Sequence, residues 1–247
     1  MKIVVSGKGG VGKTTFAGTL ARIFSDKGYM VIAADSDPSM NLHLALGMEN
    51  PRPISEYRDL ITERTVVSPG IYNLKPKVDD IVDEYSSKKE NIKLLVMGTV
   101  EVASGGCMCP ENTFLRALLR HMIVKRGEYL ILDTEAGLEH IGRGIAKKFD
   151  LMVVVVEPSA KALETANRIH DLSVEMGIQK VYAVGNKISS DKQLEYIKNN
   201  LKFEILGFIP FDEAVIEADM NDTPLWDNDS KALESIIDIS EKIEEIV

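Results

Sequence analysis

The residues best placed for chemistry lie in a glycine-rich segment near the start of the chain, Gly7-Lys8-Gly9-Gly10-Val11-Gly12-Lys13-Thr14-Thr15. It fits the pattern G-x-x-x-x-G-K-[ST] and stands between an apolar strand pattern and a helical one. Glycines let backbone N–H groups turn toward an anion, and the dipole of the following helix adds to the attraction. The segment therefore predicts a nucleotide-phosphate site for ATP or ADP, with Lys13 on the β- and γ-phosphates and the Thr14 hydroxyl on Mg²⁺.

Three aspartates come at the ends of predicted strands. Asp35 and Asp37 lie in Ala34-Asp35-Ser36-Asp37-Pro38, and Asp133 ends the run at 130–133. A carboxylate in such a position can bind Mg²⁺ directly, act through a water molecule, or simply cap a helix. Beside a phosphate loop we favour the first two roles, and Asp35 and Asp133 are candidate Mg²⁺ ligands.

The only two cysteines, Cys107 and Cys109, form a C-x-C pair in Gly105-Gly106-Cys107-Met108-Cys109-Pro110-Glu111-Asn112. A disulfide between such near neighbours would be badly strained. Pro110 suits the first position of a helix, which would place Cys109 at its cap, where thiolate is favoured. Two thiolates give half of a four-ligand Ni²⁺ or Zn²⁺ site, and a symmetric dimer could supply the other half. Two buried structural cysteines are the alternative.

Apolar, β-branched runs alternate with helix-length amphipathic stretches along most of the chain. The expected strands are 2–6, 30–34, 93–97, 129–132, 151–156, 181–184 and 203–207, and the main expected helices are 14–27, 112–125, 161–176, 192–201 and 230–247. This alternation predicts an α/β fold with a doubly wound, mostly parallel central sheet flanked by helices, and ligands at the carboxyl ends of the strands. We expect a single domain over 1–247, with irregular helices and loops around 38–92.

Charge and hydropathy narrow the classes of partner. The net charge of −9 and the pI near 5.1 argue against nucleic acid, which needs surplus Lys and Arg. The C-terminal helix has an acidic polar face, whereas a membrane-surface helix would carry basic residues. No run of eighteen apolar residues occurs, and the chain starts directly with a strand pattern, so we expect a cytoplasmic protein without a membrane partner.

The additional lysine at position 8 gives the loop the form K-G-G-x-G-K-T, which resembles the deviant Walker A class that includes MinD, ParA, Mrp and the nitrogenase iron protein. The resemblance implies that Lys8 reaches a partner subunit's nucleotide in an ATP-dependent dimer. It also implies that Asp37 orients the attacking water, and that Asp133 reaches Mg²⁺ through water. Contacts with adenine would come from Asn186, Lys187 and Pro210.

A narrower resemblance, to the CooC family of nickel-insertion ATPases, extends over essentially the whole chain. Its most specific parts are the C-x-C-P-E-N segment, which includes Cys107 and Cys109, and Glu135-Ala136-Gly137-Leu138-Glu139-His140. The resemblance implies an ATP-hydrolysing homodimer that shares one Ni²⁺ or Zn²⁺ on four cysteines. It also implies a nickel enzyme, carbon monoxide dehydrogenase, as the client.

Two other functions share the phosphate-site residues. A ParA- or MinD-like positioning ATPase would need a basic surface or a cationic terminal helix, and it would leave the two thiols without a role. An iron–sulfur electron donor or carrier like the nitrogenase iron protein would also bridge a dimer with four thiolates. That protein takes its cysteines from well-separated positions, whereas these two are two residues apart in the C-x-C motif.

Overall fold

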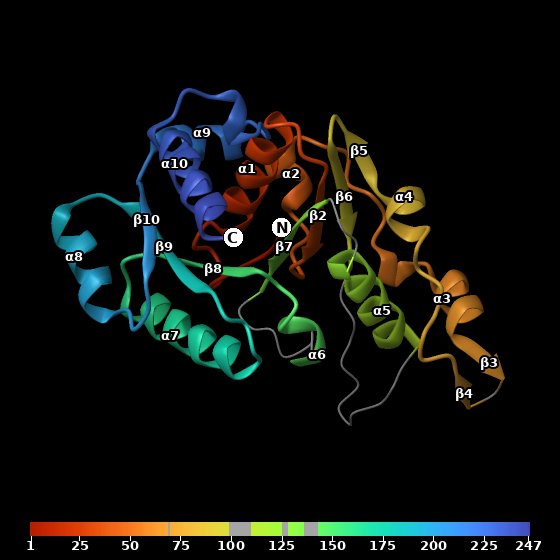
Figure 1. Ribbon diagram of the computed structural model, residues 1–247. Coiled ribbons are helices and arrows are strands. Elements are labelled where there is room, and N and C mark those ends of the chain that lie inside the picture. The colour runs from red at the N-terminus through yellow and green to blue at the C-terminus, as the bar shows by residue number, and fades with distance from the viewer. Residues whose placement is uncertain (69, 99–109, 125–127, 136–142) are drawn as a thin grey trace.

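The computed structural model describes residues 1–68, 70–98, 110–124, 128–135 and 143–247 (Figure 1). Within these residues the main sheet has eight strands in the order β10-β9-β8-β1-β7-β2-β6-β5. The strands are β1 (Lys2–Ser6), β2 (Val31–Ser36), β5 (Ser87–Lys89), β6 (Ile92–Val96), β7 (Tyr129–Thr134), β8 (Leu151–Val156), β9 (Val181–Ile188) and β10 (Ile205–Pro210). Neighbours pair in parallel except β5, which runs antiparallel to β6. The doubly wound fold predicted from the sequence is confirmed.

Helices cover both faces of this sheet, with α1 (Lys13–Asp26) and α10 (Lys231–Ile246) on one side and α5 (Pro110–Val124) and α7 (Ala160–Glu175) on the other (Figure 1). The inner strands are therefore buried on both faces, which explains their unbroken apolar runs. All of β1 and all of β8 are buried. The first residue of α5 is Pro110, the helix start that the sequence predicted.

Strand β1 lies in the middle of the sheet and pairs with β7 on one side and β8 on the other. On the far side of β7, β2 aligns so that Asp35 and Asp133 are direct cross-strand partners. The carboxyl ends of these three parallel strands meet at one edge of the sheet. The phosphate loop and the three strand-end aspartates are thereby gathered at that edge.

Helix α1 packs very closely against α2 (Leu42–Leu46). A Cβ atom built on Gly18 of α1 would lie 2.6 Å from the Cβ of Ala45 and 3.2 Å from its carbonyl carbon and oxygen. Only a residue without a side chain fits there. Gly18 therefore fixes how near α2, and the loop that leads into it, can approach the phosphate loop.

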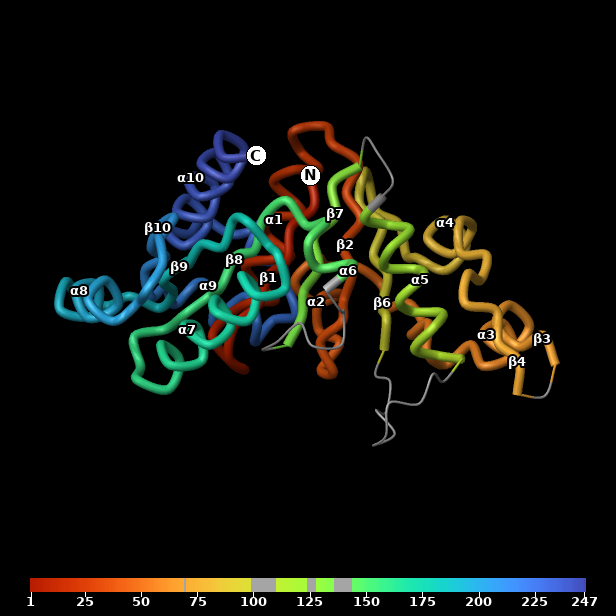
Figure 2. Tube along the Cα trace, turned by 60° about the horizontal axis from the view of Figure 1, so that its bottom comes forward, coloured from red at the N-terminus to blue at the C-terminus, as the bar shows by residue number. Residues whose placement is uncertain are grey.

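Residues 38–92 contain more regular structure than the sequence suggested. Besides α2 they form η1 (Ile54–Glu56), α3 (Arg58–Thr65), α4 (Ile81–Tyr85), a small antiparallel sheet of β3 (Val66–Ser68) and β4 (Ile71–Tyr72), and the edge strand β5. An ion pair of 2.8 Å between Arg64 and Asp80 links α3 to the start of α4. Figure 2 shows α3, α4, β3 and β4 beyond β6, at the opposite end of the molecule from α8 (Asp191–Asn200).

The C-terminal half adds α6 (Arg143–Ala146), α9 (Glu213–Met220) and η2 (Leu225–Asp227) to the helices that the sequence predicted. Serines at the N-caps of α7, α8 and α10 accept hydrogen bonds from backbone N–H groups of the first turn, which sets where each helix begins. Asp212 caps α9 and also accepts hydrogen bonds from the start of α10. In the part of the chain described here, no helix is both long and apolar enough to span a bilayer.

Candidate functional site

The phosphate loop runs from the end of β1 at Ser6 to the start of α1 at Lys13. Gly7 and Gly12 have φ angles of 150° and 94°, which side-chain-bearing residues rarely adopt. A Cβ on Gly7 would lie 2.3 Å from the carbonyl oxygen of Val155, and one on Gly12 would lie 2.4 Å from Nδ2 of Asn186. Both positions thus require glycine, and the resulting loop can turn its N–H groups toward an anion.

Lys13 is 5% exposed, and its Nζ lies 3.4 Å from Oδ2 of Asp37. Oδ1 of Asp37 accepts hydrogen bonds from the backbone N–H and the hydroxyl of Ser39, at 3.0 and 2.6 Å. Burial raises the pKa of Asp37, but the Ser39 hydrogen bonds and the Lys13 charge outweigh it and hold that pKa below its usual range. An ionised carboxylate and a buried ammonium therefore share the cavity at the phosphate loop.

Asp133 lies beneath the loop at the end of β7 and is fully buried. Among the described residues, neither of its carboxylate oxygens has a hydrogen-bond partner. Burial raises the pKa of Asp133 to about 7; the Thr14 hydroxyl is near enough to oppose this, although no well-formed hydrogen bond joins the two groups. A buried carboxylate without partners beside a threonine hydroxyl fits Mg²⁺, whose charge would keep the carboxylate ionised.

Asp35, the third strand-end aspartate, has a different environment. Its side chain is also fully buried, but its two oxygens accept hydrogen bonds from the backbone N–H groups of Asp37 and Leu42, at 3.1 and 2.9 Å. Burial raises the pKa of Asp35, and these two hydrogen bonds partly offset the effect. The carboxylate thus binds backbone of the segment that carries Asp37.

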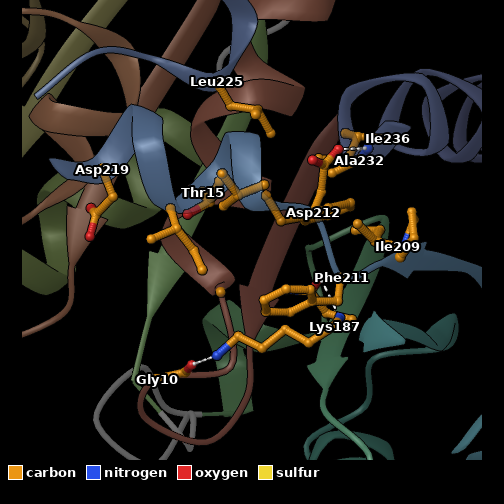
Figure 3. Close-up of a pocket in the computed structure, with 16 residues that line it drawn as sticks. Gly10, Thr15, Lys187, Ile209, Phe211, Asp212, Asp219, Leu225, Ala232 and Ile236 are labelled. Carbon is orange, nitrogen blue, oxygen red and sulfur yellow. Dashed lines mark hydrogen bonds between the residues drawn. The ribbon is translucent and has the colours of Figure 1, made fainter. Parts of the chain in front are cut away.

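Beside the loop lies a pocket of about 260 Å³, enclosed by the ends of β9 and β10 together with α9 and α10 (Figure 3). Asn186 and Lys187 belong to the last residues of β9 and connect it to the loop: Asn186 donates to the carbonyl of Val11 at 2.8 Å, and Lys187 to that of Gly10 at 2.7 Å. Lys187 has a φ of 60° and also lies 3.6 Å from the Glu157 carboxylate.

This pocket adjoins a second cavity of about 480 Å³ that is lined by Lys13, Thr14 and Asp37. Gly10, Gly12 and Thr15 line both. Pro210 lies in the first pocket, together with apolar residues that the sequence did not single out, Phe211, Val215 and Leu225. The two cavities offer adjoining space for a polyanion and for a flat, partly apolar group such as a base.

The signal for Phe211 was available in the sequence. The predicted strand at 203–207 was placed too early, whereas β10 runs from Ile205 to Pro210. Phe211 is therefore the first residue beyond the carboxyl end of a parallel strand, where ligands of such sheets bind. Val215 and Leu225 come from α9 and η2, two short helices that the sequence pattern does not predict.

Cys107 and Cys109 lie outside the described residues, as do residues 136–140 of the segment Glu135 to His140 that resembles the CooC family. Lys8 is partly exposed on the phosphate loop. The strand–loop–helix unit, the buried Lys13 and the strand-end carboxylates together define the chain as a P-loop nucleotide-binding protein.

Comparisons with known proteins agree with this class. The family model described as CobQ/CobB/MinD/ParA nucleotide binding domain matches residues 2–225. An uncharacterized ATP-binding protein of Methanocaldococcus jannaschii is 47% identical over 244 residues, which cover 96% of this chain and 95% of the relative. The carbon monoxide dehydrogenase accessory protein CooC of Rhodospirillum rubrum is 43% identical over 236 residues, 92% of this chain and 90% of the relative.

Among solved structures, the septum site-determining protein MinD of Pyrococcus horikoshii, complexed with Mg-ADP, has a TM-score of 0.72 at 21% identity and covers 99% of this chain and 95% of its own. MinD of Pyrococcus furiosus has a TM-score of 0.73 at 22% identity and covers 100% and 99%. These two similarities show the shared fold. The chain belongs to the CobQ/CobB/MinD/ParA nucleotide-binding family and, within it, to the CooC family. It is accordingly an ATPase, as the sequence predicted.

Proposed function

We propose that this ATPase is a metal-centre maturation factor, in which ATP binding and hydrolysis close and open a dimeric Ni²⁺ or Zn²⁺ site, and that its client is carbon monoxide dehydrogenase. The observation that carries the proposal is the 43% identity with the CooC accessory protein over 92% of this chain. The C-x-C pair in the sequence directly before α5 supplies the chemistry that a carrier of a thiophilic metal needs.

In this proposal the backbone of residues 7–15 surrounds the phosphates, and the ammonium of Lys13 contacts the β- and γ-phosphates. Lys13 suits the role because it is buried in the wall of the larger cavity, where a charge is less screened than at the surface. The base would occupy the adjoining pocket against Asn186, Lys187 and Pro210. Because Lys187 already binds the carbonyl of Gly10, occupancy of that pocket can influence the shape of the loop.

Thr14 and Asp133 would hold Mg²⁺, with Asp133 acting directly or through water. The bound ion would neutralise charge on the β- and γ-phosphates. Asp37 would orient the attacking water, since its carboxylate is ionised and lies in the same cavity as Lys13 and Thr14. Lys8 would extend to the partner subunit's nucleotide, so that full activity requires the homodimer.

The shared metal site makes a prediction about stoichiometry. If Cys107 and Cys109 of two subunits bind one ion, a dimer should take up one Ni²⁺ or Zn²⁺, and metal should promote dimerisation without nucleotide. By linkage, a nucleotide state that favours the geometry of the metal-bound dimer must tighten metal binding, and one that distorts it must loosen the ion for transfer.

The test is an anaerobic titration of Ni²⁺ and Zn²⁺ with ADP or ATP present, while stoichiometry and molar mass are recorded. Cys107→Ser and Cys109→Ser each remove two of the four thiolates in a dimer and should lose the ion. Met108→Ser, between the two cysteines, is the matched control and should keep it. One tightly bound ion per monomer, or equal binding by the serine variants, would refute the shared site and leave the ATPase assignment intact.

A further inference from the structure

We propose that Asp35 is a positioning residue, which holds the loop that carries Asp37, and that it is not a ligand of Mg²⁺. The inference rests on the proposed role of Asp37 in orienting the attacking water. It revises the role that the sequence alone suggested for Asp35.

The contacts of Asp35 anchor both ends of one loop to the sheet. Its backbone is fixed within β2, where its carbonyl accepts the N–H of Met97 at 2.8 Å. Its carboxylate then binds the N–H of Asp37, where the loop begins, and the N–H of Leu42, where α2 begins. A single buried side chain therefore sets the positions of two backbone amides that are five residues apart.

The loop needs this support because its conformation is unfavourable on its own. Met40 has a φ of 50°, a left-handed conformation that costs a residue with a Cβ atom free energy. The carboxylate of Asp37 must nevertheless lie 3.4 Å from Nζ of Lys13 and close to Ser39. The backbone N–H of Asp37 itself donates to the Asp35 carboxylate, and this hydrogen bond helps to set where the Asp37 carboxylate points.

Comparison with Asp133 distinguishes a positioning residue from a Mg²⁺ ligand. Asp35 and Asp133 are cross-strand partners on β2 and β7, and both are fully buried. A carboxylate can accept about four hydrogen bonds. Each carboxylate oxygen of Asp35 accepts a hydrogen bond from a backbone N–H group. Among the described residues, neither carboxylate oxygen of Asp133 has a hydrogen-bond partner. The carboxylate that needs an external cation is thus Asp133.

The experiment is a double-mutant cycle with Asp35→Ala, Asp37→Asn and the double variant, in which ATP turnover, affinity for a fluorescent ADP analogue and the Mg²⁺ concentration for half-maximal rate are measured. Displacing a reacting group by about 1 Å can cost about 100-fold in rate, so we expect a loss of this order in kcat for Asp35→Ala. Nucleotide affinity and half-saturating Mg²⁺ should stay unchanged. The double variant should be no slower than Asp37→Asn, because Asp35 acts only through Asp37.

Asp35→Asn should recover part of the lost rate, since its amide oxygen can still accept one of the two backbone N–H groups. Asp80→Asn is the matched control, because it also removes a carboxylate that accepts two hydrogen bonds, from Arg64 on α3, and it should leave kcat unchanged. Urea unfolding checks that each variant folds. Should Asp35→Ala not fold, the same cycle is run with Asp35→Asn.

The inference would be overturned if the Asp35 variants needed a higher Mg²⁺ concentration for half-maximal rate, or if the rate losses multiplied in the double variant. In either case a low turnover rate of Asp37→Asn would still support the proposed role of Asp37. Turnover by Asp37→Asn at the wild-type rate would instead refute the proposed role of Asp37, and this inference with it. The two failures are therefore distinguishable.

Discussion

Replacing Gly18 with alanine should destabilise the protein, although the same change in an ordinary helix stabilises it. In an ordinary helix, alanine raises the free energy of unfolding by roughly 0.5–1 kcal/mol, because it loses less backbone entropy than glycine on folding. The new methyl group, however, would lie 2.6 Å from the Cβ of Ala45, well inside van der Waals contact. Overpacking of this kind costs roughly 1–3 kcal/mol.

The difference between the two effects leaves a net loss of about 1 kcal/mol, which in a chain of this size lowers Tm by about 2–4 °C. Urea and thermal unfolding followed by circular dichroism would measure it. The chain offers a matched control in Gly144 of α6, where a Cβ would have no heavy atom within 4 Å, so Gly144→Ala should not destabilise. If Gly18→Ala proved as stable as wild type or more stable, the close approach of α1 to α2 would not be rigid.

Three further predictions concern the loop lysines and one ion pair. Lys13→Ala should lower turnover by about 100-fold or more, because it removes the cation that faces the developing charge on the phosphates; calorimetry and a phosphate-release assay would refute this if both affinity and rate were unchanged. Lys8→Ala should still bind nucleotide as a monomer but fail to dimerise with ATP, and a variant that dimerises normally by light scattering would contradict the proposed contact across the interface. The Asp80→Asn variant should be less stable than wild type near neutral pH, because Arg64 holds the pKa of Asp80 below its usual range. A carboxyl with a lowered folded-state pKa stabilises above its unfolded pKa of about 3.9, and this contribution is lost as pH falls through the folded value, so the two unfolding curves should converge in acid. Curves that stayed equally far apart at low pH would show that the ion pair is not the cause.

The sequence predicted the central strands β1, β2, β7 and β8 because their burial on both faces leaves a nearly unbroken apolar pattern. Strand β5 was missed for the opposite reason. Its residues Ser87, Lys88 and Lys89 are few, polar and paired on one side only, and so they resemble a charged loop. Helix α9 was missed because it is short and leaves Ile216 and Met220 exposed, which weakens the helical periodicity.

The candidate site likewise has one part that the sequence predicts and another that depends on contacts between residues far apart in the chain. A local motif was enough to locate the phosphate loop, because its glycines and lysines follow one another along the chain. The bond between Lys187 and the carbonyl of Gly10 spans 177 residues, and no local pattern encodes it. The role proposed for Asp35 is likewise beyond the motif, since the sequence shows a carboxylate but not which backbone N–H groups will face it.

The central place of β1 in the sheet also bears on how the protein is made. This strand and the phosphate loop precede their sheet neighbours along the chain, because among the described residues β1 pairs with β7 and β8, which end at Thr134 and Val156. Until those strands have left the ribosome, the apolar residues of β1 have no sheet to join, and the loop lacks the neighbouring carbonyl of Val155 that shapes it. The phosphate loop is thus synthesised well before the strands that shape it, and until β7 and β8 have emerged the nascent chain can gain no stability from bound nucleotide.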